Sequence, residues 1–295
     1  MKNALVQKKE IIDDSLKQLF LLHFKNNSEL LKMISYAFFQ EGKRLRPILA
    51  ITINEILGGS LEKIINSACA IELFHVATLL LDDLPCMDDD DYRRNKLSFH
   101  KKFSEHDAIL TSFGLCKKAF EILVTETISN NIDPLTSLNL IKQSAIHMGF
   151  DGVTGGQKVD LDMQKTLRVP KNSFGTLNYI AQNKTAKLFK LSAIIGTSFT
   201  KTSETDNDAL IQYADNLGFA FQILDDLATP KEQNPLTFYK LYGYETSVKI
   251  IKEKINTAIK QIEPFGTKAI FLKQLALNII YMTEKQKSKF KQAPA

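Results

Sequence analysis

The feature of this sequence best suited to chemistry is a run of acidic residues that follows a long apolar segment. From Asp82 to Asp91 the chain reads DDLPCMDDDD, which places six carboxylates within ten residues. Carboxylates this close raise one another's pKa unless a cation neutralises them, and oxygen ligands favour a hard ion such as Mg²⁺. Pro85 should break the turn after Asp82 and let Asp88 return toward the same ion. The run predicts a magnesium site, with a solvated acidic loop as the alternative.

Calcium fits this run poorly. An EF-hand loop needs alternating ligands, a central glycine and a closing glutamate, and the run from Asp82 to Asp91 has none of that spacing. The hard ion expected here is therefore Mg²⁺.

A second aspartate pair lies near the end of another long apolar segment. Asp225 and Asp226 follow Gln222 by three and four residues, so the three polar groups project from nearly one face of a predicted helix. Alone, such a pair would fit an ordinary helix surface. Together with the first pair, it indicates a second set of metal or substrate ligands.

Basic residues of the kind that bind phosphate occur in two places. The segment GKRLRP, from Gly42 to Pro47, puts three cations at a predicted helix start, where backbone amides also favour an anion. Arg93 and Arg94 directly follow the acidic run, and guanidinium groups grip phosphate oxygens in bidentate fashion. These residues predict a diphosphate site.

Two further positions add to this set. His75 lies seven residues before Asp82 and hence on nearly the same helix face, while Lys184 and Thr185 supply a cation and a hydroxyl. The alternative for His75 is a hydrogen-bonded core residue, and for Lys184 a solvated one.

The elements that position these residues should all be helices. Gly (13) and Pro (8) are scarce in the 295 residues, 44% of the chain is hydrophobic, and helix-period patterning recurs throughout. No linker divides the chain, so we expect one all-α domain over residues 1–295, a bundle of about ten helices. The predicted helices are 4–23, 28–40, 44–57, 60–83, 105–129, 134–150, 173–199, 205–228, 244–262 and 266–284.

Composition also excludes several classes of protein. The net charge of +5 is spread among acidic residues, which does not favour nucleic-acid binding. Three cysteines without metal-ligand spacing, and a start without a secretory pattern, fit a reducing cytoplasm. The apolar runs are too short to predict an integral membrane segment.

Taken in order, these residues resemble the polyprenyl synthetase family, which includes farnesyl and geranylgeranyl diphosphate synthases. The pattern of two aspartates, four residues and Asp88 is similar to the family's first aspartate-rich motif. Later landmarks are Gly155-Gly156-Gln157 with Asp160, Lys184-Thr185, and Phe221-Gln222 with Asp225-Asp226. The resemblance implies an isoprenoid synthase fold, in which the helices surround a central cavity.

The resemblance also implies a reaction and roles for the residues. Isopentenyl diphosphate would condense head to tail with an allylic diphosphate, with Mg²⁺ as cofactor. Asp82 and Asp88 would hold two ions and Asp225 a third. The implied catalytic set is Asp82, Asp83, Asp88, Lys184, Asp225 and Asp226. The implied substrate-binding set is Gly42, Lys43, Arg46, His75, Arg93, Arg94, Thr185 and Gln222.

Small side chains before the first aspartate motif bear on product length. In the resembling family the growing tail passes this point, and a bulky aromatic stops it early. Ala77 and Thr78 stand there, which favours a C20 over a C15 product, with Phe113 or Phe120 as an alternative floor. The family's habit of pairing subunits implies a homodimer.

The chain departs from the family pattern in four places. The third acid of the second motif is absent, since the run continues as Leu227-Ala228-Thr229. The loop after it looks shortened, which leaves Lys231 as a substitute for the family's lysine. Ser112-Phe113 replaces a Gly-Asp pair, and Asn95 replaces the glycine that usually follows the paired arginines.

These departures keep two rival functions open. The first is a non-catalytic family member that serves as the regulatory partner of an active synthase. The second is a terpene cyclase, although the later Asn, Ser and Glu metal ligands of such enzymes are missing here.

Overall fold

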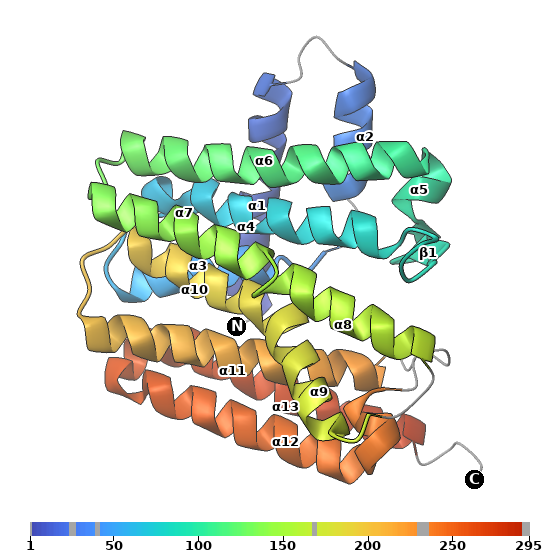
Figure 1. Ribbon diagram of the computed structural model, residues 1–295. Helices are drawn as coiled ribbons and strands as arrows, with labels where there is room; N and C mark the ends of the chain where they lie inside the picture. Colours follow the sequence, from blue (N-terminus) through green and yellow to red (C-terminus); the bar gives the residue numbers. More distant parts are fainter. Residues whose placement is uncertain (1, 24–27, 39–41, 167–169, 229–235, 291–295) are drawn as a thin grey trace. The chain divides into compact units, whose positions relative to one another are not determined.

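The chain is built almost wholly of helices (Figure 1). The computed structural model describes residues 2–23, 28–38, 42–166, 170–228 and 236–290. The α-helices are α1 (Lys2–His23), α2 (Ser28–Phe38), α3 (Leu45–Ile56), α4 (Leu61–Asp82), α5 (Phe99–Lys102), α6 (Glu105–Ser129), α7 (Pro134–Met148), α8 (Val153–Thr166), α9 (Ser173–Ile180), α10 (Lys187–Ser198), α11 (Glu204–Ala228), α12 (Phe238–Ile262) and α13 (Ile270–Phe290). The all-α prediction is confirmed.

Three short elements interrupt the helices. The strands β1 (Tyr92–Arg93) and β2 (Lys96–Leu97) pair in antiparallel fashion. A π-helix (Ala181–Ala186) joins α9 to α10, and a 3-10 helix (Glu263–Ala269) precedes α13. Both the hairpin and the π-helix carry candidate site residues, so the irregular segments matter more here than their length suggests.

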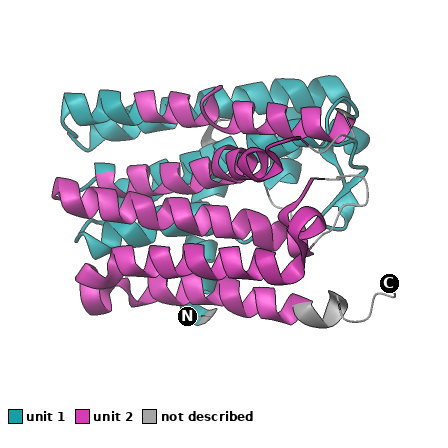
Figure 2. Cartoon of the chain, turned by 60° about the horizontal axis from the view of Figure 1, so that its bottom comes forward, with its two compact units in different colours: residues 1–141, 198–200 teal, residues 142–197, 201–295 magenta. Residues whose placement is uncertain are grey.

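Contacts between residues divide the chain into two compact units (Figure 2). Unit 1 comprises residues 1–141 and 198–200, and unit 2 comprises residues 142–197 and 201–295. The single domain over residues 1–295 and its central cavity stay predictions. Each unit is described below by itself.

Unit 1 is organised around α4. This helix packs against α6, α3 and α1, and most of its side chains are buried. Among the described residues, α4 is the one helix with the length and hydropathy that could cross a membrane, but 67% of its most apolar window is buried inside the protein. Such burial is typical of the core helix of a globular unit. Asp82, at its C-terminal end, is therefore held at the end of a rigid support.

Unit 2 is organised around α11, which packs against α12, α13 and the π-helix. The π-helix also packs against α8. Gly156 makes this contact possible, because a Cβ atom there would lie 2.3 Å from the backbone nitrogen of Lys184. The bare glycine lets α8 lie directly on the backbone that carries Lys184 and Thr185.

Candidate active site

The acidic run forms a tight loop at the end of α4. The amide of Asp88 donates to the carbonyl oxygen of Asp82 at 2.9 Å, and the amide of Met87 donates to that of Leu84 at 2.8 Å. The backbone thus turns back after Pro85, as the sequence predicts. Asp82 and Asp88 are both partly exposed. Their role as metal ligands stays a prediction.

Asp83 has a different environment from Asp82. It is buried, and the Nε atom of Arg93 donates to both of its carboxylate oxygens at 2.7 and 2.8 Å. Burial raises the pKa of Asp83 although the hydrogen bonds from Arg93 oppose that shift. The structure therefore joins two residues that the sequence assigned separately to catalysis and to substrate binding, and Asp83 orients Arg93.

The hairpin places Arg94 and Asn95 in its turn. Tyr92 pairs with Leu97 and Arg93 with Lys96, which leaves a two-residue turn whose φ angles are 52° at Arg94 and 62° at Asn95. Positive φ at both central residues is the pattern of a type I′ turn, in which Asn and Gly are preferred. The asparagine that departs from the family pattern is thus conformationally suited to its position.

The other basic residues of unit 1 gather around His75. Burial lowers the pKa of His75 well below its usual value, and Arg46, Arg94, Arg93 and Arg44 lower it further. A neutral imidazole surrounded by guanidinium groups can donate one hydrogen bond to an anion without adding charge. Lys43 is exposed and Arg46 is half-buried. Unit 1 therefore brings Arg46, His75, Arg93 and Arg94 into one electropositive region.

The two predicted chain-length residues lie one turn before Asp82. Ala77 is buried, and its carbonyl oxygen accepts a hydrogen bond from Ser112 of α6 at 2.7 Å. Thr78 is partly exposed, and its hydroxyl donates to the carbonyl oxygen of His75 at 2.8 Å. Phe113 is mostly exposed, whereas Phe120 stacks edge-on against the buried Phe74 with ring centroids 5.1 Å apart.

Unit 2 brings the second set of residues together through three helical elements. Lys184, on the π-helix, forms an ion pair with Asp160 of α8. Thr185 donates a hydrogen bond to Gln222 of α11, and the Gln222 amide donates in turn to Asp226 at 2.9 Å. The order Thr185, Gln222, Asp226 forms a continuous polar chain. Lys184, Thr185, Gln222 and Asp226 are thus assembled as the sequence motifs suggested.

The electrostatics of unit 2 suit a divalent cation. The pKa of Asp226 is raised to about 8, chiefly by burial; the carboxylates of Asp225 and Asp160 add to this shift, and Gln222 and Lys184 oppose it. Such a value means that the carboxylates lack sufficient positive charge nearby. Among the described residues, no group of three or more His, Cys, Asp or Glu side chains is placed to hold a metal ion. Mg²⁺ usually takes only one or two carboxylates and completes its shell with water and phosphate oxygens, and the pair Asp225 and Asp226 could supply that number.

Three residues of these sites were missing from the predicted set. Asp160 is tied to Lys184, and its spacing after Gln157 was the available signal. Gln157 is buried with neither amide atom hydrogen-bonded to the described residues. Glu72 is a buried acid in an otherwise apolar stretch of α4, and that contrast was its signal. Lys231 lies outside the described residues.

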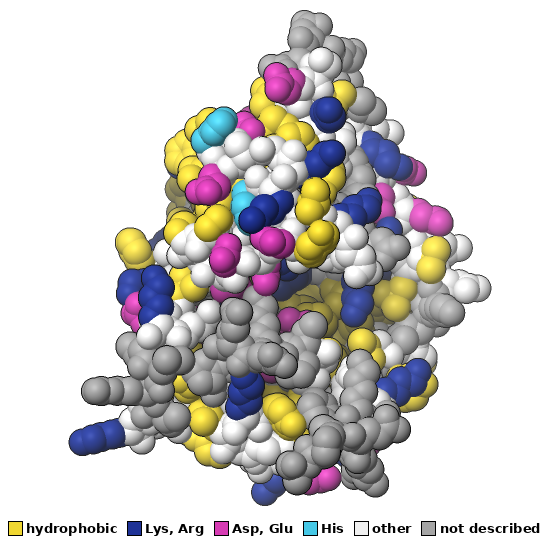
Figure 3. Space-filling view, turned by 90° about the vertical axis from the view of Figure 1, so that its right-hand side faces the viewer, with side chains coloured by type: hydrophobic (Ala, Val, Ile, Leu, Met, Phe, Trp, Pro, Cys, Tyr) yellow, Lys and Arg dark blue, Asp and Glu magenta, His cyan; other side chains and the backbone are white. Residues whose placement is uncertain are grey.

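The surface charge agrees with the composition. On the face drawn in Figure 3, acidic and basic side chains lie interspersed with hydrophobic ones instead of separating into a broad field of one charge. A surface that binds nucleic acid would present a clustered basic stripe. The described residues of this face show no such stripe.

Comparison with known proteins points to one family. The family model described as polyprenyl synthetase matches residues 27–234. The chain is 35% identical over 297 residues to a protein named dimethylallyltranstransferase from Fischerella ambigua (strain UTEX 1903), with 96% of this chain and 84% of the relative covered. It is 32% identical over 286 residues to a geranylgeranyl diphosphate synthase from Cyanophora paradoxa, with 92% and 93% covered.

A solved structure agrees with these relatives. The apo crystal structure of an FPP/GFPP synthase from Zymomonas mobilis superposes with a TM-score of 0.85 at 34% sequence identity. The superposition covers 95% of this chain and 100% of that one.

Proposed function

Because this chain belongs to the polyprenyl synthetase family, we propose that it is a prenyltransferase that joins isopentenyl diphosphate head to tail to an allylic diphosphate. The observation that carries this proposal is the loop in which Asp88 donates to the carbonyl of Asp82, at the edge of the electropositive region around His75. An acidic loop beside several guanidiniums suits a substrate that brings both diphosphate and a divalent cation.

We propose that Asp82 and Asp88 hold two Mg²⁺ ions and that Asp225 holds a third. Bound there, Mg²⁺ would neutralise the charge that develops on the leaving diphosphate. Arg93, oriented by Asp83, would bind the allylic diphosphate. Isopentenyl diphosphate would be held by Lys43, Arg46, His75 and Arg94, with the neutral His75 as a hydrogen-bond donor.

The residues of unit 2 would act on the allylic group. The linked side chains of Thr185 and Gln222 present oxygen atoms whose dipoles can stabilise a developing carbocation. Asp160 fixes the ammonium of Lys184 through the ion pair, and that ammonium would contact the diphosphate. Proton loss to the departing diphosphate would complete each condensation.

We propose a short-chain product, C20 in preference to C15. Support comes from the size of the residues one turn before Asp82, where Ala77 and Thr78 leave room along α4. The buried Phe74 lies a further turn back and stacks against the partly exposed Phe120, and this pair is suited to limit the tail.

We propose a homodimer that acts in the cytoplasm. Several large apolar side chains are exposed along α6 and at the start of α7, among them Phe113 at 64% and Leu135 at 76%. Large exposed apolar side chains of this kind can form part of a protein interface. Light scattering on purified protein would measure the mass, and a monomer at micromolar concentration would reject this assignment.

The decisive experiment is incubation with Mg²⁺, isopentenyl diphosphate and dimethylallyl, geranyl or farnesyl diphosphate, followed by mass analysis. A C15 or C20 diphosphate would support the proposal and set the chain length. A cyclised hydrocarbon would indicate a terpene cyclase. Folded protein that makes no product with any primer, but raises the activity of a separate synthase, would indicate the regulatory subunit instead.

A further inference from the structure

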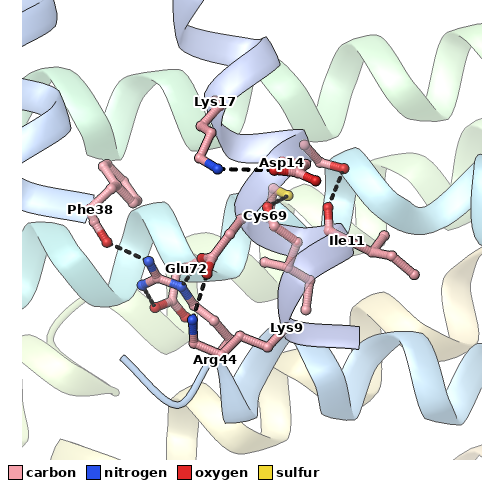
Figure 4. A network of polar contacts seen from close by, with 11 residues as sticks. Lys9, Ile11, Asp14, Lys17, Phe38, Arg44, Cys69 and Glu72 are labelled. Atoms are coloured by element: carbon pink, nitrogen blue, oxygen red, sulfur yellow. Dashed lines mark hydrogen bonds and ion pairs between the residues drawn. The ribbon is translucent and has the colours of Figure 1, made fainter. Parts of the chain in front are cut away.

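Arg44 lies buried beside the residues proposed to bind isopentenyl diphosphate. Only 3% of it is exposed. Its Nε atom donates to Asp13 of α1 at 2.8 Å, its Nη1 atom donates to Glu72 of α4 at 2.7 Å, and its Nη2 atom donates to the carbonyl oxygen of Phe38. Figure 4 shows the guanidinium between Glu72 and Phe38. Arg44 directly precedes α3, so its side chain links the start of α3 to α1, to α4 and to the end of α2.

Burying these charged groups costs free energy, which suggests that the ion pairs of Arg44 do more than stabilise the fold. Removing a guanidinium and a carboxylate from water carries a large desolvation penalty, and well-packed apolar residues often stabilise a fold as well or better. Arg44 also has a left-handed backbone, with φ 50° and ψ 32°, a conformation that residues other than glycine rarely adopt. The ion pairs therefore hold a strained residue in place.

The strained residue lies in the middle of the basic segment. Lys43 immediately precedes Arg44 and is exposed, while Arg46 follows within the first turn of α3. The directions in which Lys43 and Arg46 leave the backbone depend on the dihedral angles at Arg44. A change at Arg44 would consequently move both proposed diphosphate ligands.

Arg94 approaches the same network. A Cβ atom at Gly42 would lie 2.9 Å from one terminal nitrogen of Arg94 and 3.0 Å from one of Arg44, so both guanidiniums lie close to this glycine. Burial lowers the pKa of Arg94, Arg44 and Arg93 lower it further, and Glu72 is the main group that opposes the shift. Glu72 supplies negative charge where like-charged guanidiniums approach one another.

We propose that Arg44 is a positioning residue: paired with Asp13 and Glu72, it holds residues 42–47 in the conformation in which Lys43 and Arg46 bind isopentenyl diphosphate. This inference rests on the proposed function and adds residues of α1 and α4 to it. It makes α1, which contributes no proposed ligand, a part of the substrate site.

Replacing Glu72 distinguishes a role in positioning Arg44 from a purely electrostatic effect of the Glu72 charge on substrate binding. Glu72→Gln removes a negative charge near a site for an anion, so electrostatics alone predicts tighter binding and a lower KM for isopentenyl diphosphate. Loss of positioning predicts a higher KM. Asp13→Asn makes the same test at a side chain that is 18% exposed, where the protein should tolerate the change.

The experiment measures steady-state kinetics of the full chain, with each substrate varied at a saturating level of the other. For Asp13→Asn and Glu72→Gln we expect the KM for isopentenyl diphosphate to rise about tenfold, because small displacements of binding groups are expensive. The KM for the allylic diphosphate and kcat should change less than about threefold, since Arg93 is held by Asp83 instead. Arg44→Lys should behave like these variants, because an ammonium cannot reproduce the planar guanidinium that donates to Asp13, Glu72 and Phe38 at once.

The chain offers a matched control in the ion pair between Lys8 of α1 and Glu55 of α3. Glu55→Gln breaks a second link between α1 and its neighbours without contact with Arg44, and both KM values should stay unchanged. If Glu72→Gln does not fold, Asp13→Asn decides the question. An unchanged or lower KM for isopentenyl diphosphate in the folded variants, or an equal rise for both substrates, would overturn the inference. Absence of turnover in the unmodified chain would instead reject the proposed function.

Discussion

The amide nitrogen of Asp88 lies 2.9 Å from the carbonyl oxygen of Asp82, so the backbone itself closes the acidic loop. This hydrogen bond joins two backbone atoms and involves neither carboxylate. A site whose ligands are presented by a closed backbone loop can lose one carboxylate without losing its shape. This separation of fold from chemistry makes the loop well suited to mutation.

Asp82→Ala should reduce turnover by at least about 100-fold, the usual scale for removing a group that stabilises developing charge. The free energy of unfolding should be nearly unchanged, because the carbonyl of residue 82 still accepts from Asp88. Product formation and urea denaturation together measure the two effects. Asp89→Asn is the matched control, since this exposed residue has φ 52° and asparagine accepts that conformation. Equal activity in the Asp82 and Asp89 variants would contradict the metal assignment.

Asn95→Gly should leave stability and activity intact, because glycine adopts positive φ without strain. Asn95→Val should lower the free energy of unfolding by about 1–2 kcal/mol, since a β-branched residue is strained in that region. It should also raise the KM for isopentenyl diphosphate by displacing Arg94. Thermal unfolding and kinetics of the pair test the turn, and equal behaviour of glycine and valine would exclude it.

Gly156→Ala should destabilise unit 2 by about 1–3 kcal/mol, the usual cost of forcing atoms into a packed interface. The added methyl would meet the backbone of Lys184 and should lower turnover as well. Gly114→Ala on α6 is the control, because a Cβ atom there meets nothing within 4 Å. Urea denaturation of both variants provides the comparison. A Gly156 variant as stable as the Gly114 variant would show that α8 does not need the close approach.

Thr78→Phe should shorten the product from C20 to C15. Thr78 is partly exposed, so it can accept an aromatic ring more readily than the buried Ala77 can. Mass analysis of the products from farnesyl and geranyl primers gives the ratio of chain lengths. Ile109→Phe, on an exposed position of α6, should leave that ratio unchanged. An unaltered ratio in the Thr78 variant would place the floor of the tail pocket elsewhere.

His147 should make stability depend on pH below neutrality. Its pKa is lowered from 6.5 to about 4, chiefly by burial; the hydrogen bond to the carbonyl oxygen of Gln143 opposes this shift, and Lys187 and Lys190 add to it. The unfolded chain binds a proton below pH 6.5 whereas the folded chain does not until about pH 4. Stability therefore falls as pH decreases through this window, by about 3 kcal/mol in total.

The measurement is the difference in unfolding free energy between the unmodified chain and His147→Gln at several pH values. This difference should shrink as pH falls from 6.5 to 4. His106→Gln, at a side chain that is 77% exposed, serves as the control and should run parallel to the unmodified chain. A parallel profile for the His147 variant would show that this imidazole does not titrate differently on folding.

The sequence predicted the long helices well and failed where packing overrides local preference. The predicted helices 60–83 and 105–129 correspond to α4 and α6, because both have strong apolar periodicity. No helix was predicted between residues 150 and 173, yet α8 begins at Val153 and contains Gly155 and Gly156. Glycine is a poor helix former, but the close packing of α8 against the π-helix outweighs that local preference here.

Two other differences have similar causes. The predicted helix 173–199 is one continuous segment of helical structure, but its middle widens into a π-helix that no local pattern indicates. The helix predicted from residue 244 begins at Phe238 instead, with a kink at Gly243 where φ is 78°. The predicted end of α2 at residue 40 lies outside the described residues.

The site was predicted by residue type better than by pairing. Lys184, Thr185, Gln222 and Asp226 lie together as the motifs implied. The bond between Asp83 and Arg93 depends on how the hairpin folds back, and the partners of Arg44 come from helices distant in sequence. Sequence spacing carries no information about such long-range ion pairs.

The π-helix also has an evolutionary meaning. A π-turn differs from an α-turn by one extra residue, so the segment from Ala181 to Ala186 is what a single-residue insertion into an ordinary helix would leave behind. Deleting Asn183 would let this segment close into ordinary α-helical turns and would shift its residues about the helix axis. Lys184 and Thr185 would then face different neighbours. Descendants of this chain can therefore vary the residue types in this segment more freely than its length.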